Sequence, residues 1–206
     1  MNSELRMTQY INNPSPQTSQ PLVALYCGSR SGNNPIYQEK AVQLARKLAE
    51  QGFGMVYGGG SIEVMATVAA TTVQNGGQAV GVIPEFMLDY EIAHSNLTEL
   101  HVVKSMHERK AMMADRASAF VALPGGLGTF EEILEIATWG QLNQHQKPMI
   151  LYNVNGFYDA LIQQLDHAVH EGFLPPQHRA KLIVCNHSHK IINALKNLDA
   201  PPHFVG

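Results

Sequence analysis

Seven short apolar runs constrain the fold of this chain more than any other feature of its sequence. Each run is four to six residues long, and most of them are continuous rather than alternating with polar residues. Continuous runs of this length are typical of strands that are covered on both faces, as in a parallel sheet. The runs are 22–27, 54–57, 79–83, 98–103, 119–123, 148–152 and 181–184.

Stretches with helical character separate the apolar runs. They lie near residues 36–51, 62–75, 105–116, 129–142, 157–170 and 187–197. This alternation predicts an α/β fold, with a single doubly wound (Rossmann-like) parallel sheet and helices on both faces. Residues 1–21 are polar and show no period, so they predict a flexible tail before one α/β domain that spans 22–206.

The overall charge and hydropathy exclude several classes of partner. The 206 residues carry a formal net charge of -3, which gives no bulk attraction to nucleic acid. No apolar run reaches the roughly 18 residues that a membrane span requires, and the amino terminus lacks the apolar segment of a signal peptide. The sequence therefore predicts a cytoplasmic protein that binds neither nucleic acid nor a membrane.

In a doubly wound sheet, ligands bind beyond the carboxyl ends of the strands. The turn after the fifth apolar run, residues 124–129, has the sequence PGGLGT. Its glycines leave backbone N–H groups uncovered, and Thr129 is a suitable N-cap for the helix predicted to follow. A glycine-rich turn that leads into a helix N-terminus favours an anion, so we interpret this turn as a phosphate site rather than a plain connection.

Known phosphate motifs narrow the choice of ligand. The turn contains no Gly-Lys-Ser/Thr and therefore is not the P-loop of an ATP-hydrolysing enzyme. The dinucleotide fingerprint GxGxxG also fails, because Glu131 stands at the position of its third glycine when the count starts at Gly126. A nucleoside monophosphate or another small phosphate ester remains.

Carboxylates follow the turn on the predicted helix. Glu131 and Glu135 fall on one flank near Thr138. The face toward the sheet is expected to hold the apolar residues spaced by three and four, which are Phe130, Ile133, Leu134 and Ala137.

Glu132 lies further round this helix, beside Ile136 and Trp139. A carboxylate next to apolar surface and one turn from a phosphate site is a candidate catalytic group. A glutamate in a first turn also complements the positive end of the helix dipole. The residues alone leave both roles open.

Positive charge gathers at the start of the helix predicted after the fourth apolar run. Ser105 and Glu108 have the spacing of a capping box, and His107, Arg109 and Lys110 fill the first turn. Cations at this end oppose the helix dipole, so local stability does not explain them. An anionic ligand or a partner carboxylate nearby would explain them, and the alternative is a solvated surface cluster.

Two motifs carry a resemblance to a known family. Pro124–Glu132 reads PGGxGTxxE and Met106–Lys110 reads MHxRK. Both are complete and correctly ordered, so the chain resembles the LONELY GUY family of cytokinin riboside 5′-monophosphate phosphoribohydrolases, long labelled lysine decarboxylases. The likeness covers about residues 22–195 and includes the segments CGSRSGNNPIY and GGQAVGVIP.

The resemblance implies hydrolysis of the N-glycosidic bond of AMP or of cytokinin riboside 5′-monophosphates. The products would be an adenine-type base and ribose 5-phosphate. The resemblance also implies that the nucleotide-binding domain needs no cofactor and no metal. The ten histidines form no HExxH pattern, which agrees with the absence of a metal site. The family also implies a homodimer.

Individual residues receive roles from the resemblance. Arg109 and Glu132 correspond to the catalytic residues of the family, so Glu132 would stabilise positive charge on the ribose and activate water while Arg109 keeps it ionised. Substrate contacts are implied for a larger set, which is Ser29, Glu91, Met106, Lys110, Gly125, Gly126, Leu127, Gly128, Thr129, Glu131 and Thr138.

One segment departs from the family pattern. Two residues after its three glycines the family usually reads Gly-Leu-Met-Gly, whereas this chain reads EVMA at residues 63–66. Ala66 in place of glycine is a mild change. Glu63 brings a side chain and a charge to a turn that is expected to face the ligand, where it lowers phosphate affinity, alters substrate choice or points to solvent.

Other functions stay open at this point. One is a broader nucleoside 5′-monophosphate nucleosidase for nucleotide salvage, and another is a nucleotide-binding protein without catalysis. Pyridoxal-phosphate-dependent lysine decarboxylation is disfavoured, because phosphate binding accounts for Lys110 beside Arg109. Residues 84–96 form a lid over the base or a plain connection, and Ile136 and Trp139 serve a pocket for a substituted adenine or a dimer contact.

Overall fold

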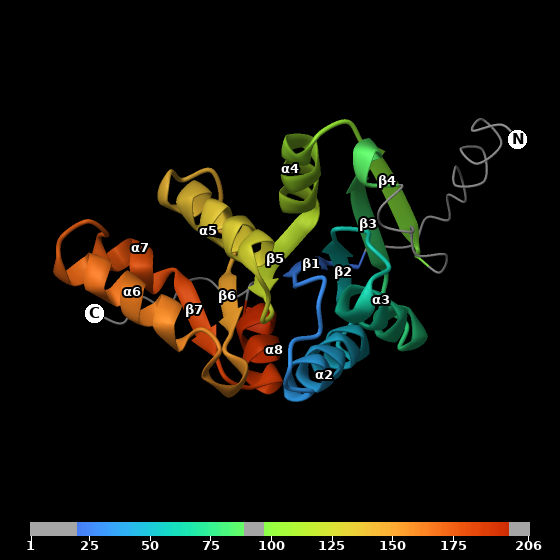
Figure 1. The fold of residues 1–206 in the computed structure, drawn as a ribbon, viewed down its shortest axis with the longest axis horizontal. Helices are drawn as coiled ribbons and strands as arrows, with labels where there is room; N and C mark the ends of the chain where they lie inside the picture. Colours follow the sequence, from blue (N-terminus) through green and yellow to red (C-terminus); the bar gives the residue numbers. More distant parts are fainter. Residues whose placement is uncertain (1–19, 89–96, 198–206) are drawn as a thin grey trace, which may run out of the picture.

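A parallel sheet of seven strands forms the centre of the molecule (Figure 1). The structure, a computed structural model, describes residues 20–88 and 97–197. The strand order is β4-β3-β2-β1-β5-β6-β7, and every predicted apolar run is confirmed as a strand. The strands are β1 (Leu22–Tyr26), β2 (Gly54–Tyr57), β3 (Ala79–Pro84), β4 (Glu99–Val103), β5 (Ala117–Ala122), β6 (Met149–Tyr152) and β7 (Leu182–Cys185).

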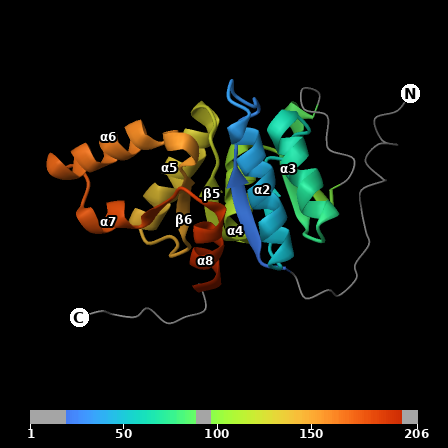
Figure 2. The same cartoon turned by 90° about the horizontal axis from the view of Figure 1, so that it is seen from below.

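Helices cover both faces of the sheet, as predicted. One face packs against α2 (Ile36–Glu50), α3 (Glu63–Gln74) and α8 (Ser188–Lys196), and α2 lies between the other two (Figure 2). The opposite face packs against α4 (Met106–Arg116), α5 (Leu127–Gln141) and α6 (Asp159–His170). None of the described helices combines the length and the apolar character needed to cross a membrane.

Three short helical segments complete the described part of the chain. The 3₁₀ helices η1 (Glu85–Met87) and η2 (Val154–Gly156) follow β3 and β6. The one-turn helix α7 (Pro176–Ala180) was not predicted from the sequence. It starts with a proline at its first helical position, where the missing N–H costs nothing.

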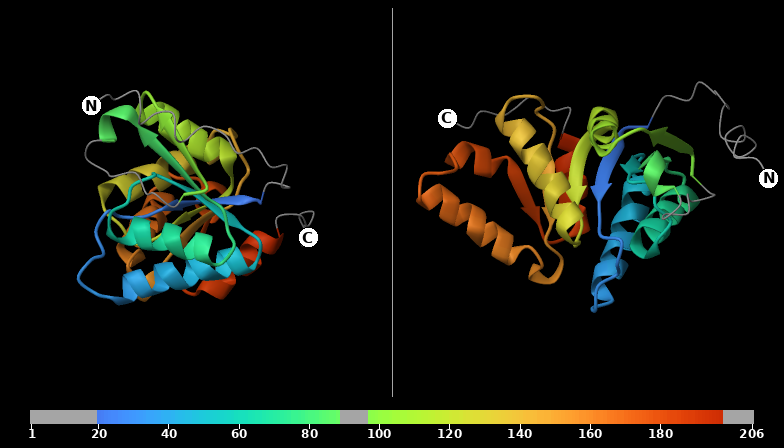
Figure 3. Two further views of the ribbon diagram at one scale, coloured as in Figure 1. Left: turned by 90° about the vertical axis from the view of Figure 1, so that its right-hand side faces the viewer. Right: turned by 45° about the horizontal axis from the view of Figure 1, so that its top comes forward.

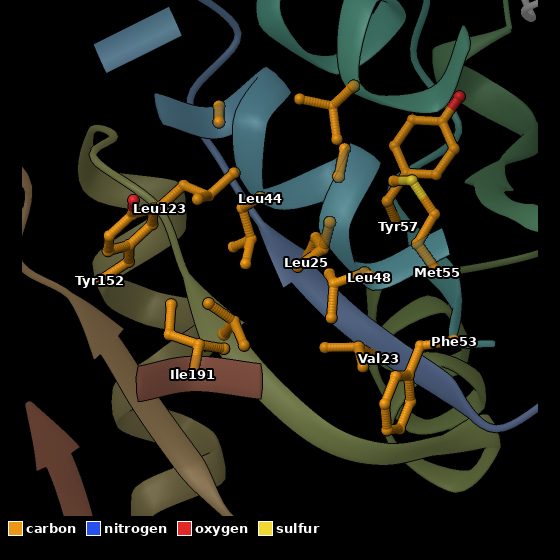
Figure 4. Packing of buried hydrophobic residues seen from close by; sticks show 14 of the residues in the cluster. Val23, Leu25, Leu44, Leu48, Phe53, Met55, Tyr57, Leu123, Tyr152 and Ile191 are labelled. Atoms are coloured by element: carbon orange, nitrogen blue, oxygen red, sulfur yellow. The ribbon is translucent and has the colours of Figure 1, made fainter. Parts of the chain in front are cut away.

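Burial on both faces explains why the strands read as continuous apolar runs. Successive side chains of β1 point to opposite faces, so that Val23 and Leu25 enter one core while Ala24 and Tyr26 enter the other. All five residues of this strand are buried. Figure 4 shows Leu25 near Leu44, and Val23 near Leu48 and Phe53, in the first core.

The sheet changes its direction of winding between β1 and β5. These strands pair side by side at the centre of the sheet, with Tyr26 opposite Ala122 (Figure 3). The chain runs from β1 outward to β4 and then returns across the sheet to β5. Such a switch point creates a crevice at the carboxyl ends of the two strands, which is where ligands bind in open α/β sheets.

The predicted tail is too long by two residues. The side chain of Gln20 donates a hydrogen bond to the Gly76 carbonyl (3.1 Å) and accepts one from the Gln78 N–H (2.9 Å). The Pro21 carbonyl accepts a hydrogen bond from the Gly54 N–H (3.0 Å). These contacts join Gln20 and Pro21 to the sheet, and residues 1–19 lie outside the described part of the chain.

We expect Tyr158→Phe to destabilise the fold by about 1–2 kcal/mol, because it removes a buried hydrogen bond. Tyr158 is fully buried, and its hydroxyl donates to the Leu123 carbonyl (2.6 Å), directly before the 124–129 turn. Urea unfolding measures the loss. Tyr37→Phe is the matched control, since the Tyr37 hydroxyl makes no hydrogen bond to the described residues; equal unfolding midpoints for both variants would contradict the assignment.

Candidate active site

Two turns meet at the carboxyl edge of the sheet, one after β1 and one after β5. A methyl group added at Gly28 would lie only 3.1 Å from the Gly125 Cα, so the two backbones are in contact. A cavity of about 480 Å³ opens beside this contact. Residues 28–32 and Tyr37 line one side of it, and residues 124–126 and Phe157 line the other. The cavity lies at the switch point, as the fold requires of a ligand site.

The helix after the phosphate turn starts earlier than predicted. Its N-cap is Gly126 and its first residue is Leu127, so the prediction that Thr129 is the N-cap was wrong. Thr129 is instead the third helical residue and is buried. The first N–H groups of a helix have no acceptor within it, so the amides that start α5 remain available at the edge of the cavity.

Gly125 has no room for a side chain. A methyl group at this position would overlap Thr129 Oγ1 and would lie 2.7 Å from the Gly28 nitrogen. The turn can therefore close on α5 and on the β1 turn only with glycine here. Thr129 Oγ1 is itself buried and has no hydrogen-bond partner among the described residues.

The buried face of α5 differs from the predicted one. The fully buried positions are Thr129, Ile133, Ile136 and Gly140, whereas Phe130, Leu134 and Ala137 are only partly buried. The buried face of the helix is therefore shifted relative to the predicted one, and it places Thr129 next to Gly125 of the turn. Ile136 is 1% exposed, so the prediction that it serves an outer pocket or a dimer contact was wrong.

The start of α4 confirms the predicted cap. Ser105 Oγ accepts a hydrogen bond from the Glu108 N–H (3.2 Å). The Glu108 carboxylate in turn accepts one from the Lys104 N–H (2.8 Å). This cap fixes the first turn of α4, which carries Arg109 and Lys110 toward the start of α5.

Arg109 is the buried cation of the site. Only 8% of the residue is exposed, and its guanidinium lies against the Gly58 Cα, where any side chain would overlap it. Its Nη1 contacts the sulfurs of Met106 (3.7 Å) and Met87 (3.8 Å), which are weak acceptors. Nε has no partner, and Arg109 forms no ion pair, within the described residues. A buried guanidinium left in this way has donors free for a ligand.

Lys110, the neighbour of Arg109, has partner carboxylates. Its Nζ lies 2.5 Å from Glu131 Oε1 and 3.0 Å from Glu135 Oε1, which joins α4 to α5. Burial lowers the pKa of Lys110, but the hydrogen bonds that its ammonium donates to the two glutamates raise the pKa by more, so the net shift is upward. Of the explanations open for the cation cluster, a partner carboxylate therefore holds for Lys110.

Glu132 carries the strongly perturbed carboxyl group of the site. Burial raises its pKa, the nearby Arg109 lowers it and Glu131 raises it again, so that the pKa reaches about 7. We expected Arg109 to keep Glu132 ionised, but here the effect of burial exceeds that of the guanidinium. A carboxyl group with this pKa exchanges protons near neutrality, as general acids and bases do.

Tyr26 lies beneath these carboxylates and was not recognised from the sequence. It is buried at the end of β1, and its pKa is raised well above the usual value by burial and by the charges of Glu132, Glu135 and Glu131. The hydroxyl therefore stays protonated. Gly58, which makes room for Arg109, was also missed, although its place directly after β2 was a signal for this edge of the sheet.

The other predicted contacts are spread over the site. Ser29 lines the cavity, and Gly126, Leu127 and Gly128 are exposed at the start of α5. Thr138 is exposed, and its hydroxyl group donates a hydrogen bond to the Leu134 carbonyl (2.8 Å). Glu91 and part of the predicted lid at 84–96 lie outside the described residues. Within 20–88 and 97–197, no three His, Cys, Asp or Glu side chains converge as metal ligands would.

Solved structures share the fold. A molybdenum cofactor carrier protein from Chlamydomonas reinhardtii superposes with a TM-score of 0.65 at 20% identity, over 88% of this chain and 99% of that chain. A molybdenum cofactor binding protein from Rippkaea orientalis gives the same TM-score at 19% identity. At this level of identity the likeness establishes the fold alone.

Sequence comparison is more specific. Residues 65–195 match the family model described as "Possible lysine decarboxylase". The cytokinin riboside 5′-monophosphate phosphoribohydrolase of Rhodococcoides fascians is 42% identical over 185 residues, which is 89% of this chain and 91% of the relative. The enzyme of this name in Arabidopsis thaliana, LOG7, is also 42% identical, over 88% of this chain and 83% of the relative. The chain therefore belongs to the family of cytokinin riboside 5′-monophosphate phosphoribohydrolases, the family that the resemblance had indicated.

Proposed function

We propose that this protein hydrolyses the N-glycosidic bond of adenine-type nucleoside 5′-monophosphates, including AMP and cytokinin riboside 5′-monophosphates. The products are the free base and ribose 5-phosphate. The observation that carries the proposal is the buried guanidinium of Arg109, which has no ion-pair partner among the described residues, near Glu132, a carboxyl group whose pKa is about 7. The relatives that bear the name of this activity support the same conclusion.

Phosphate binding would place the sugar. The amides at the start of α5 and the turn at 124–126 offer donors to the 5′-phosphate, and the buried hydroxyl of Thr129 adds a further unused polar group. Glu132 lies one turn further along α5. A phosphate anchored at the helix end therefore brings the ribose close to this carboxylate. The reaction between sugar and carboxylate then becomes effectively unimolecular, which lowers its entropic cost.

Cleavage then follows the chemistry of glycoside hydrolysis. The bond between C1′ and the base nitrogen breaks, its electron pair leaves with the base, and positive charge grows on the ribose ring. The Glu132 carboxylate stabilises that charge and accepts a proton from the water whose oxygen bonds to C1′, and the departing base takes up a proton from solvent, which completes the hydrolysis. Arg109 holds the substrate and offsets the negative charge that gathers around Glu132.

Lys110 argues against pyridoxal-phosphate-dependent lysine decarboxylation, despite the description of the matching family model. A lysine that forms a Schiff base must lose its proton, which a depressed pKa favours. The pKa of Lys110 is raised, and two carboxylates hold its ammonium group. We assign Lys110 and Glu131 to the shaping of the site, with Glu131 half exposed toward the substrate.

The assembly and location are proposals as well. We infer a homodimer, as the family resemblance implies, and a cytoplasmic location, as the sequence predicts. Phe86 and Val102, which are 59% and 47% exposed beside the edge strand β4, are apolar surface that a second subunit would cover.

We expect Glu132→Gln and Arg109→Ala each to lower kcat/KM for adenine release from AMP by about 10²- to 10⁴-fold, because each removes a group that acts on the reacting sugar. Adenine and ribose 5-phosphate are quantified by chromatography. Arg116→Ala is the matched control on the same helix, since Arg116 pairs with Glu99 at the surface. Wild-type turnover in both site variants, with unchanged thermal unfolding, would refute the assignment.

The ionisation of Glu132 gives a second prediction. The base form is the deprotonated one, so kcat/KM for AMP should rise with pH and level off above an apparent pKa of about 7. The phosphate of AMP itself titrates near pH 6. The Glu132→Gln variant has no titrating carboxyl group at this position. The pH dependence of its affinity for AMP therefore reports the titration of the phosphate alone, which can be separated from that of Glu132. A profile that stays flat or falls between pH 6 and pH 8 would contradict the role of general base.

A panel of nucleotides decides the substrate class. We expect AMP and N6-prenylated AMP to be cleaved with kcat/KM at least about 10²-fold above that of CMP, because a pocket built for adenine leaves polar groups unpaired with other bases. GMP and IMP complete the panel. Similar rates for all five would establish a broad nucleoside monophosphate nucleosidase, and AMP binding without base release would establish a nucleotide-binding protein.

A further inference from the structure

Glu63, the first residue of α3, has an unusual backbone conformation. Its φ is +40°, and the other described residues besides glycine with positive φ are Asn143 and Asn155. Asparagine tolerates this region, whereas glutamate rarely adopts it. An unfavourable conformation of this kind persists where the surroundings hold it in place, and it is common at functional sites.

Hydrogen bonds of the Glu63 side chain hold its backbone in this conformation. Its Oε2 accepts hydrogen bonds from the Ser31 N–H (2.5 Å) and from Ser31 Oγ (2.7 Å). These hydrogen bonds lower the pKa of Glu63, and the charge of Arg30 adds to the effect. The carboxylate therefore stays ionised and connects the start of α3 to the turn after β1.

No other hydrogen bond within the described residues reaches the segment 28–33. Backbone hydrogen bonds resume only at Asn34, whose carbonyl accepts from the Tyr37 N–H (3.2 Å). A turn with two glycines and no further hydrogen bonds has little to fix its shape. Its conformation therefore depends on Glu63.

This turn forms one wall of the 480 Å³ cavity, and its charge suits the proposed substrate. Arg30 and Ser31 line the cavity across from Gly125 and Gly126. Arg30 is exposed and forms no ion pair with the described residues. A guanidinium opposite the amides of α5 is placed to meet the same phosphate from the other side.

We propose that Glu63 is a positioning residue for nucleotide binding: by holding Ser31 it fixes the 28–33 turn, with Arg30, as the second wall of the phosphate cavity. The inference rests on the proposed function for its ligand. A role for Glu63 as a helix-dipole partner alone would require neither its positive φ nor the two bonds to Ser31. Of the outcomes that the sequence left open for this position, the geometry contradicts a side chain that merely points to solvent.

The first test measures the turn in the free protein. We expect Glu63→Gly to speed hydrogen exchange of the Ser31 amide by about tenfold, since this amide is the hydrogen-bonded one in the turn and loses its acceptor. Asn143→Gly is the matched control, because it also relieves a positive φ but lies in the turn after α5. Unchanged exchange in Glu63→Gly would overturn the inference whatever the protein binds.

The second test measures AMP turnover. Glu63→Gly should raise KM for AMP about five- to tenfold, with kcat within twofold of wild type, because binding is weakened and the reacting groups are intact. Glu63→Gln, which keeps an acceptor oxygen, should give an intermediate KM. The double variant Ser31→Ala/Glu63→Gly should have nearly the same KM as Glu63→Gly, since the two substitutions remove the same contact. Arg30→Gln should raise KM without changing the exchange rate.

The outcomes separate the two proposals. A lower KM in Glu63→Gly would show that the carboxylate repels the phosphate, and would overturn the positioning role. An unchanged KM together with faster exchange would also overturn it. A wild-type protein that neither binds nor cleaves AMP would overturn the proposed function, while the exchange measurement would still test whether Glu63 fixes the turn.

Discussion

At the carboxyl edge of the sheet, the turns after β1 and β5 approach so closely that residue 125 has room only for a hydrogen atom. The Gly125 position is bounded by the Gly28 backbone on one side and by Thr129 Oγ1 on the other. This contact fixes where α5 begins and therefore where its free amides lie. On the same helix, Glu132 is largely buried and close enough to Arg109 for the guanidinium to lower its pKa.

The electrostatic balance of the site follows from this placement. Lys110 is committed to Glu131 and Glu135, so it partly neutralises two of the three carboxylates on the helix. Arg109 and Glu132 remain as a cation and an acid that influence each other through space and share no hydrogen bond among those described. Burial acts against the ionised form of the acid. A dianionic nucleotide would supply oxygen acceptors, whereas the described residues offer this guanidinium only the sulfurs of two methionines.

The sequence was sufficient for the fold and for the residues of the two motifs. Continuous apolar runs predicted the parallel strands, because burial on both faces leaves no polar residue in β1 and only Ser118 in β5. The sequence did not predict the rotation of α5, since the spacing of Ile133 and Ile136 fits two overlapping faces of a helix. The observed face carries Thr129 inward, where its Oγ1 fills the space beside Gly125.

Contacts between distant segments were harder to foresee. Gly58 makes room for Arg109, and Glu63 binds Ser31, through side-chain reach across the edge of the sheet. Neither pairing has a signal in the spacing of residues along the chain. The contact of Gln20 was not foreseen either. This residue was predicted as part of the polar tail, but its side chain forms a hydrogen bond to the Gly76 carbonyl.

The pairing of β1 with β5 also bears on how the protein becomes active during synthesis. Leu22 pairs with Ala117, so the centre of the sheet closes only after more than half of the chain has left the ribosome. The turn at 124–129 and Glu132 are synthesised later still. Nascent or prematurely terminated chains that end before α5 would carry Arg109 but lack both Glu132 and the amides at the helix start, so the proposed reaction centre would be incomplete in them.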